Sequence, residues 1–335
     1  MPDEIQKIVN DLAQRFDPRV TVFNLQVQKI ENGILSLSGS LLTQDQLPVI
    51  KDALSRQLAD LRLDTASIKF LERSNLPCFH VATNLTGFYE KPTFGVPLVS
   101  ELTFGTELEI LEESGRWAFA RQQDGYLGWA YLPYLAEGTA AAATHLVLAP
   151  SHELRAEPDG TSEVITRLMS GTGVQVEETR DDWARVIANE TGWMPSRYLR
   201  GIDHLPKTLE EKRKALLEDS QRMTGVPYLW GGMSGNGIDC SGFARLLHRW
   251  IGVDIPRDAD MQCAAARPVE PPFEVGDLLF FAEDDDKRNI SHVGMSLGGW
   301  KMVHSSRSRN GVHVDDLQEK TSLMSIFASA GSFLR

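Results

Sequence analysis

An internal repeat constrains the fold of this chain more than any other feature. The segment beginning at Leu102 matches the segment beginning at Leu168 without a gap, at an offset of 66 residues. Both copies share residues at equivalent places: Gly105 and Gly171, Thr106 and Thr172, Trp117 and Trp183, and, after a two-residue shortening, Gly128-Trp129 and Gly192-Trp193. Each copy is a series of short alternating segments separated by glycine, which predicts a small β-barrel. We therefore expect barrels at 79–136 and 146–202, with 136–145 as the linker.

Both copies end on a Gly-Trp motif, in DGYLGWAYLPYL and ETGWMPSRYL. These segments resemble the last strands of bacterial SH3-like (SH3b) domains. The resemblance covers about a third of the chain and implies two SH3-like barrels.

The segment before the repeat alternates between helical and strand-like spacing. Apolar residues have helical spacing over 4–16 and 44–60, and they alternate over 20–27, 35–41 and 66–71. A turn is expected at Glu31-Asn32-Gly33. Residues 1–76 are therefore predicted to form a small α+β module. Its VTVFNL and GILSLSGSL segments resemble a BON domain, and an unrelated structural module is the alternative.

Charge and cysteine content narrow the classes of function. The chain has 34 basic against 46 acidic residues and a net charge of −12, which opposes binding to nucleic acid or acidic membranes. No apolar run is long enough for a membrane span or a signal peptide. The three cysteines, Cys78, Cys240 and Cys263, are too few and too scattered for a disulfide framework. We expect a cytoplasmic protein in a reducing compartment; the oligomeric state is not indicated.

Cys240 lies where a glycine-rich segment meets a predicted helix. Residues 231–237 are rich in glycine, whereas 241–250 have helical spacing. The start of a helix offers free N–H groups and the positive end of the helix dipole, which lower the pKa of a cysteine. Cys240 is therefore expected to be a reactive thiolate, although buried, inert cysteines also occur at such positions.

Two histidines are expected on one β-hairpin. His292 begins HVGMSL and His304 ends KMVH, with Gly298-Gly299-Trp300 between them. A two-residue loop would send the two rings to opposite faces, whereas a three-residue loop leaves them on one face, diagonally placed. We predict the three-residue loop.

Cys240, His292 and His304 then supply a nucleophile, a base and a group that orients the base. The alternative is a metal site, since cysteine and histidine are also ligands. No CxxC or HxxxH pair accompanies them, so neither a metal nor another cofactor is expected.

The last third of the chain resembles the NlpC/P60 family of cysteine peptidases, which have a papain-like core and cleave bacterial cell-wall peptides. The resemblance spans 207–335 and rests on YLWGG, DCSGF, GDL and HVG followed by His304. It implies that Cys240 is the nucleophile, His292 the base, His304 the orienting residue and Tyr228 an oxyanion donor. The expected fold class is α+β, a papain-like domain after two barrels and the N-terminal module.

The resemblance also implies a set of substrate contacts. In relatives that recycle cell-wall peptides, the first barrel closes one end of the groove, so that a free amino terminus must find acceptors there. The residues at matching positions are Asp239, Ser241, Tyr126, Glu90, Trp230 and Asp258. The repeat pairs Tyr126 with Glu190 and Glu90 with Ala156, so the second barrel lacks both groups. Tyr126 as a rim aromatic, Glu90 as a solvated charge and Asp258 as a local ion-pair partner of Arg257 remain alternatives.

The expected activity, implied by the resemblance, is hydrolysis of the γ-D-glutamyl to diamino-acid bond of murein tri- or tetrapeptides. The alternatives are a secreted endopeptidase that acts on polymeric murein and a non-catalytic wall-binding protein. His248 and His313 belong to no motif and are expected to be structural. The acidic run 283–286 is expected to be a solvated loop.

Overall fold

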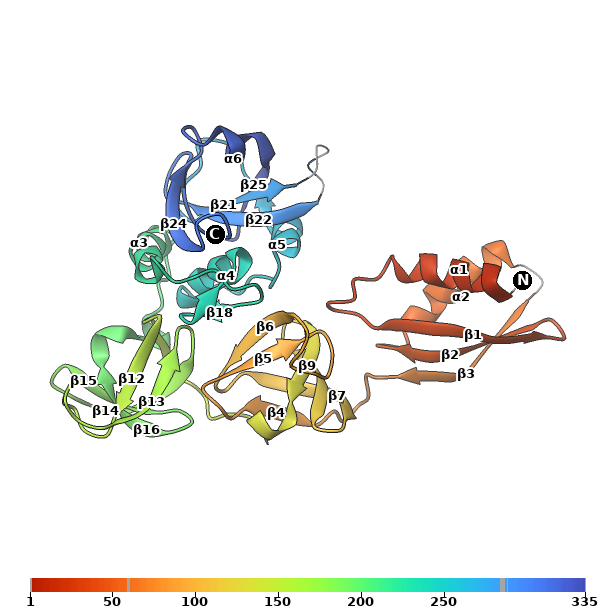
Figure 1. Ribbon diagram of the computed structural model, residues 1–335, viewed down its shortest axis with the longest axis horizontal. Coiled ribbons are helices and arrows are strands. Elements are labelled where there is room, and N and C mark those ends of the chain that lie inside the picture. The colour runs from red at the N-terminus through yellow and green to blue at the C-terminus, as the bar shows by residue number, and fades with distance from the viewer. Residues whose placement is uncertain (1, 59–60, 284–286, 288, 335) are drawn as a thin grey trace.

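Four units follow one another in the computed structural model of the chain (Figure 1). The structure describes residues 2–58, 61–283, 287 and 289–334. Residues 284–286 of the acidic run lie outside the described residues, and so does most of the loop predicted there. The two barrels lie side by side beneath the C-terminal domain, and the N-terminal module stands beside the first barrel. No helix among the described residues is long and apolar enough to cross a membrane.

The N-terminal module is a three-stranded sheet with two helices. The central strand pairs antiparallel with the first strand and parallel with the third, and the second helix makes the crossover that a parallel pair requires. Asn32 and Gly33 both have positive φ, 51° and 73°, as in the tight hairpin turn expected there. The elements are α1 (Pro2–Ala13), β1 (Phe23–Glu31), β2 (Ile34–Leu41), α2 (Gln46–Gln57) and β3 (Arg62–Phe70).

The first strand begins later than the alternating pattern predicts. Val20 and Val22 continue the alternation but lie in the loop that follows α1. Val22 packs against a small cluster that includes Leu111 and Leu127 of the first barrel. The apolar residues before Phe23 therefore serve the contact between the module and the barrel rather than the sheet.

Each repeat copy folds into a seven-stranded sheet with its own core. Gly105 and Gly171, matched by the repeat, have φ of 78° and 75°, so both copies need glycine at this turn. The first barrel consists of β4 (Cys78–Val81), β5 (Leu85–Tyr89), β6 (Leu98–Thr103), β7 (Glu107–Ser114), β8 (Trp117–Gln122), β9 (Leu127–Tyr131) and β10 (Leu135–Glu137). The second consists of β11 (His145–Val147), β12 (Ser151–Arg155), β13 (Val164–Met169), β14 (Gly173–Arg180), β15 (Trp183–Ile187), β16 (Thr191–Pro195) and β17 (Leu199–Gly201).

In the part of the chain that the structure describes, the C-terminal domain packs four α-helices with a six-stranded sheet of order β20-β25-β21-β22-β23-β24. Its helices are α3 (Leu209–Ser220), α4 (Cys240–Trp250), α5 (Ala259–Ala265) and the short α6 (Thr321–Ile326). The sheet strands are β20 (Arg267–Pro268), β21 (Leu278–Ala282), β22 (Ile290–Ser296), β23 (Lys301–Ser306), β24 (Gly311–Asp316) and β25 (Phe327–Ser332), and β18 (Met233–Ser234) with β19 (Gly237–Ile238) forms a ribbon before α4.

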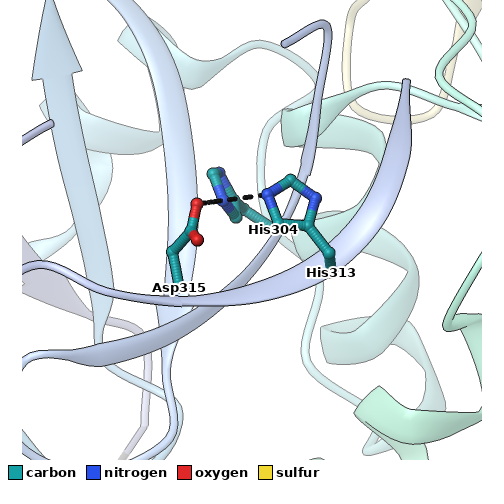
Figure 2. Close-up of side chains that lie close together, drawn as sticks. All are labelled: His304, His313 and Asp315. Carbon is teal, nitrogen blue, oxygen red and sulfur yellow. Dashed lines mark hydrogen bonds and ion pairs between the residues drawn. The ribbon is translucent and has the colours of Figure 1, made fainter. Parts of the chain in front are cut away.

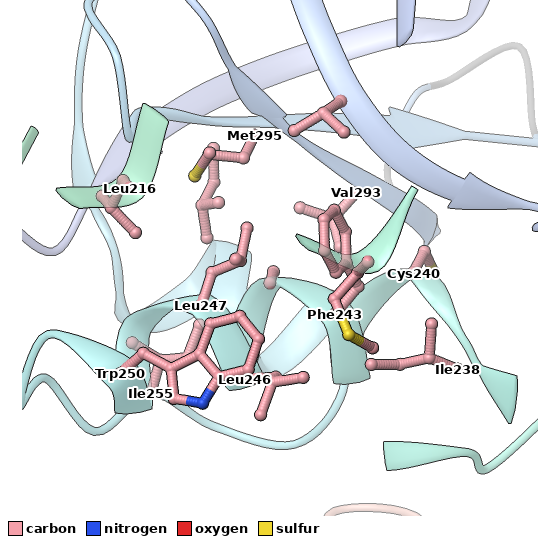
Figure 3. Packing of buried hydrophobic residues seen from close by; sticks show 14 of the residues in the cluster. Leu216, Ile238, Cys240, Phe243, Leu246, Leu247, Trp250, Ile255, Val293 and Met295 are labelled. Atoms are coloured by element: carbon pink, nitrogen blue, oxygen red, sulfur yellow. The ribbon is translucent and has the colours of Figure 1, made fainter. Parts of the chain in front are cut away.

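Helix α4 is held against the sheet by the main core of this domain. Its apolar face, which includes Phe243 and Leu247, packs with Val293 and Met295 of β22 (Figure 3). Trp250 at the end of the helix is fully buried and donates its indole N–H to the Val147 carbonyl of the second barrel at 2.9 Å. The helix that carries Cys240 is therefore fixed at both its sheet side and its barrel side.

The buried His248 and His304 and the half-buried His292 predict how stability depends on pH. Burial lowers the pKa of His248 to about 4, of His292 to about 3 and of His304 to about 4. Unfolded histidines titrate near pH 6.5, so between about pH 6.5 and 4 the unfolded chain binds more protons. Stability should fall as the pH decreases through this window, by up to about 1.4 kcal/mol per pH unit for each histidine.

Thermal unfolding between pH 7 and 4 measures this loss. Nε2 of His248 has no hydrogen-bond partner among the described residues, and the variant His248→Phe should lose less stability on acidification than the wild type. An unchanged slope in this variant would contradict the buried-histidine explanation.

Candidate active site

Cys240 is the first residue of α4, as the sequence predicts. Asp239 caps the helix by accepting the Gly242 amide at 2.7 Å, and it also accepts the Gly231 amide at 2.9 Å. One carboxylate therefore closes the glycine-rich segment and starts the helix. The cap fixes the backbone on both sides of the thiol.

The ionisation of Cys240 differs from the sequence expectation. Burial, followed by the negative charge of Asp239, raises the pKa of the thiol to about 12, although the backbone N–H groups of Val293 and Ser241 lower it. The helix-start position alone led us to expect a lowered pKa. The sulfur is packed in the domain core beside a carboxylate, so the resting group is a neutral thiol that must give its proton to a base as it reacts.

The predicted histidine hairpin is confirmed. Met295 pairs with Val303 and Ser296 with Met302, and the Leu297 amide donates to the Lys301 carbonyl at 2.7 Å, which leaves Gly298, Gly299 and Trp300 as the loop. This register places the two histidines diagonally on one face. His292 Nε2 and His304 Nδ1 lie 2.7 Å apart.

A third strand extends this arrangement beyond the predicted residues. His304 Nε2 lies 3.3 Å from Asp315 Oδ2, and His313 Nε2 lies 3.2 Å from the same oxygen (Figure 2). Arg309 pairs with the other oxygen of Asp315 at 3.0 Å. His313 was expected to be structural, and Asp315 was not singled out. The sequence signal was the alternation of His313 and Asp315 on the strand after the hairpin.

Asp315 determines which nitrogens carry protons. The lowered pKa values of His292 and His304 leave their rings neutral at pH 7. His304 donates Nε2–H to Asp315, so its Nδ1 is an acceptor for the Nε2–H of His292. The remaining nitrogen of His292, Nδ1, then has a free lone pair. The chain of hydrogen bonds thus prepares His292 as a base, and the residue after it, Val293, directs its N–H at the thiol.

The ligand atoms of His304, His313 and Asp315 lie within 4.8 Å of one another, a spacing that a metal ion could also use. The two hydrogen bonds to Asp315 account for their approach. We therefore assign the three side chains to the hydrogen-bonded chain behind His292.

Tyr228 and Trp230 lie on the segment before the glycine-rich loop. Tyr228 is half-buried, and burial together with the neighbouring Cys240 raises the pKa of its hydroxyl, which keeps it a neutral donor. Trp230 is 58% exposed, and the Arg307 guanidinium lies 5.5 Å from its ring centre. The oxyanion and substrate roles implied for these two residues stay predictions.

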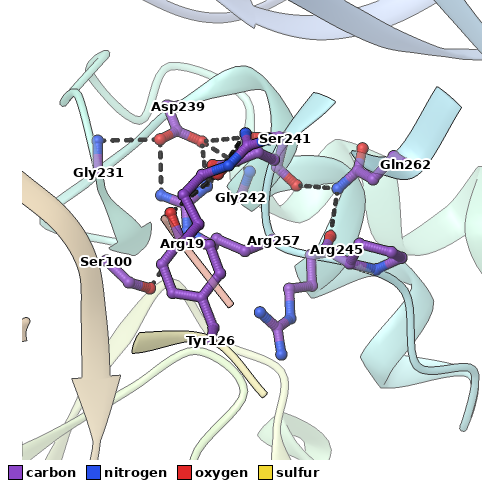
Figure 4. A network of polar contacts seen from close by, with 12 residues as sticks. Arg19, Ser100, Tyr126, Gly231, Asp239, Ser241, Gly242, Arg245, Arg257 and Gln262 are labelled. Carbon is purple, nitrogen blue, oxygen red and sulfur yellow. Dashed lines mark hydrogen bonds and ion pairs between the residues drawn. The ribbon is translucent and has the colours of Figure 1, made fainter. Parts of the chain in front are cut away.

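Asp239 and Ser241 belong to a buried ion-pair network (Figure 4). Arg257, which is 1% exposed, donates to both oxygens of Asp239, at 3.1 and 2.7 Å, and to the Ser241 hydroxyl at 3.0 Å. Together with the Gly231 and Gly242 amides, these donors give both oxygens of Asp239 more than one hydrogen bond each. Asp239 therefore supports the site, and the substrate contacts predicted for Asp239 and Ser241 stay predictions. The local pair expected between Arg257 and Asp258 is loose, at 3.9 Å.

Tyr126 connects the first barrel to this domain. Its hydroxyl donates to Asp258 Oδ2 at 2.8 Å, and the side chain is buried. The structure thus brings together two of the predicted substrate contacts from segments 132 residues apart. Arg19 of the N-terminal module joins the same oxygen at 3.0 Å, a contact that no sequence pattern indicated.

Glu90 is exposed and forms no hydrogen bond or ion pair with other described residues, so its predicted role stays a prediction. Other carboxylates of the first barrel do reach the C-terminal domain: Glu101, whose Oε2 accepts the Met233 amide at 2.8 Å, and Asp124, which pairs with Arg245 of α4 at 2.7 Å. Burial raises the pKa of Glu101. The 66-residue offset could have indicated Glu101, because it pairs this acidic residue with a basic one, Arg167, in the second barrel.

Comparisons with known families agree with this geometry. Residues 225–329 match the NlpC/P60 family, 88–131 match the bacterial dipeptidyl-peptidase SH3 domain, and 152–200 match the bacterial SH3 domain. The chain contains a cysteine peptidase domain of the NlpC/P60 family. Two bacterial SH3 domains precede this peptidase domain, and the expected α+β fold class is confirmed.

The matched region is a different share of each relative's own length. A gamma-D-glutamyl-L-lysine dipeptidyl-peptidase of Bacillus subtilis is 37% identical over 142 residues, which are 40% of this chain and 48% of that protein. A protein of the same name from Bacillus cereus is 26% identical over 65% of this chain and 70% of its own. A solved NlpC/P60 family protein from Bacillus cereus superimposes with a TM-score of 0.67 at 21% identity, over 77% of this chain and all of its own, and supports the fold.

Proposed function

We propose that the peptidase domain hydrolyses the γ-D-glutamyl to diamino-acid bond of short cell-wall peptides that carry a free amino-terminal L-alanine. The observation that carries this proposal is the bond between Tyr126 of the first barrel and Asp258 of the peptidase domain. It places a carboxylate and a phenol together at the junction of the two domains. The names of the two Bacillus relatives point to the same bond.

The reaction uses the neutral thiol and the neutral imidazole of the resting site. The proton of Cys240 passes to Nδ1 of His292 as the sulfur attacks the γ-carbonyl carbon. The oxyanion of the tetrahedral intermediate accepts hydrogen bonds from the Tyr228 hydroxyl and from the Cys240 amide, which as the first amide of α4 has no partner within the helix. The imidazolium of His292 then protonates the departing amine, which leaves a thioester. A water molecule, deprotonated by His292, releases the acid and restores the thiol.

His304 and Asp315 support the imidazolium that forms during this reaction. His304 is placed at 2.7 Å to accept the Nε2–H of His292, and Asp315 supplies the negative charge behind it. The reaction requires no metal or other cofactor in this scheme.

The free amino terminus of the substrate is proposed to bind between Tyr126 and Asp258. Tyr126 donates its proton to Asp258, so the lone pairs of the phenol oxygen remain available to an ammonium group. Asp258 offers its second oxygen, Oδ1, whose cationic neighbour among the described residues is Arg257 at 3.9 Å. An ammonium group buried there needs such acceptors, because an unpaired buried charge is costly.

The substrate requirement suggests a role in recycling free murein peptides inside the cell. All three cysteines are free thiols, which suits a reducing compartment. The net charge of −12 disfavours retention on anionic polymers. Both the cytoplasmic location and the recycling role belong to the proposal.

Incubation with two free tripeptides and with intact murein tests the proposal. Purified protein is mixed with L-Ala-γ-D-Glu-L-Lys, with its meso-diaminopimelate counterpart, and with intact murein sacculi, and products are identified by mass spectrometry. We expect release of L-Ala-D-Glu from at least one free tripeptide and little release from sacculi. Faster cleavage of sacculi supports the secreted-endopeptidase alternative, and sedimentation with sacculi without cleavage supports the wall-binding alternative.

A further inference from the structure

The guanidinium of Arg19 joins the N-terminal module to the peptidase domain. Its guanidinium donates to Asp17 at 2.9 and 2.7 Å, to Asp260 at 2.7 and 2.6 Å, and to Asp258 at 3.0 Å. These bonds use all five of its N–H groups. Figure 4 shows Arg19 beside Tyr126, in the network below Asp239.

The backbone of Arg19 is held by the first barrel. Its carbonyl accepts the amide of Leu127, the residue after Tyr126, at 2.7 Å. The loop that carries Arg19 is further packed by Val22 against Leu111 and Leu127. The module therefore contacts the Tyr126 segment through its backbone and, through Asp258, the Tyr126 hydroxyl.

The charges around Arg19 also favour this arrangement. Three carboxylates, those of Asp17, Asp258 and Asp260, converge on one guanidinium, which raises the pKa of Arg19 and lowers the pKa of Asp17 and Asp260. The group as a whole keeps an excess of negative charge that can attract an ammonium. Without Arg19, the carboxylates would repel one another and Asp258 would lose a bond that fixes its orientation.

We propose that Arg19 is a positioning residue for recognition of the substrate amino terminus, so that the N-terminal module completes the closed end of the groove. This inference rests on the proposed function. Arg19 holds Asp258 by Oδ2, the oxygen that also binds Tyr126, and so leaves Oδ1 directed at the ammonium. The chemical group that it selects is a primary ammonium at the end of a short peptide.

The variant Arg19→Ala tests this role in the full chain. The substrates are the free tripeptide that the wild type cleaves and the same peptide with an acetylated amino terminus. We expect KM for the free tripeptide to rise about tenfold, with kcat within about twofold. The ratio of kcat/KM between free and acetylated peptide should fall by a similar factor, a change that a merely structural contact would not produce.

Two further variants control the result. Arg56→Ala removes an exposed arginine of the same module, whose ion pair with Asp52 is remote from the network, and should match the wild type. Arg19→Lys keeps the charge but not the five-bond geometry, and should give an intermediate KM; it also serves if Arg19→Ala does not fold. An unchanged KM and an unchanged free-to-acetylated ratio in folded Arg19 variants overturn the inference. Failure of the wild type to cleave either peptide instead overturns the proposed function.

Discussion

Replacing Cys240 by serine should lower kcat/KM for the free tripeptide at least about ten-thousandfold. The alcohol is a poorer nucleophile than the thiol, and the acyl-enzyme depends on the sulfur at the start of α4. Binding of the product dipeptide L-Ala-D-Glu, measured by calorimetry, should stay within about twofold, because the proposed ammonium contacts come from Tyr126 and Asp258. The loss is therefore expected in turnover and not in affinity.

Cys263 provides a matched control in the same domain. Its sulfur lies 3.3 Å from the Ser329 hydroxyl and takes no part in the histidine chain. Cys263→Ser should keep activity within about twofold. Residual activity of Cys240→Ser above about one hundredth of the wild type, or loss of activity in Cys263→Ser, would place the nucleophile elsewhere.

Replacing Arg257 by methionine should destabilise the peptidase domain by about 3–5 kcal/mol. Arg257 is 1% exposed and is the ion-pair partner of Asp239, which is itself buried. Its removal leaves the carboxylate that caps α4 without a compensating charge, and Ser100 of the first barrel loses the Nε–H bond at 3.1 Å. The chain has several domains, so calorimetry should follow the transition of the peptidase domain rather than a single midpoint.

A double variant separates the ion pair from packing. Asp239→Asn keeps a side chain that can cap the helix but removes the charge. The combination Asp239→Asn with Arg257→Met should cost less than the sum of the single changes. The exposed Arg267, whose side chain donates a long 3.5 Å bond to the Leu334 carbonyl, gives the control Arg267→Met, expected within about 0.5 kcal/mol. Additive costs in the double variant would contradict the account of the pair.

The parts of the fold that follow from local pattern could be predicted from the sequence. The 66-residue offset indicated both barrels, and the equal φ of Gly105 and Gly171 shows why glycine recurs there. The hairpin register followed from side-chain alternation and loop length, and the structure confirms that His292 and His304 share a face. Alternation of apolar residues also indicated the N-terminal strands, except where Val22 packs against the first barrel.

Contacts between distant segments could not be predicted in this way. Arg257 and Asp239 are 18 residues apart, and Arg19 and Asp258 are 239 apart. No periodicity connects such positions, because their approach depends on how whole domains pack. The expectation of a lowered pKa for Cys240 was wrong for the same reason. The helix start was visible in the sequence, but burial and the charge of Asp239 beside the sulfur were not.

The requirement for a free amino terminus tests the account most directly. The measurement is kcat/KM of the wild-type protein for the tripeptide and for its N-acetylated form. Acetylation removes the charge that Tyr126 and Asp258 are proposed to accept, so we predict a decrease of at least about a hundredfold. Equal values for the two peptides would contradict the closed groove and the role of the first barrel in it.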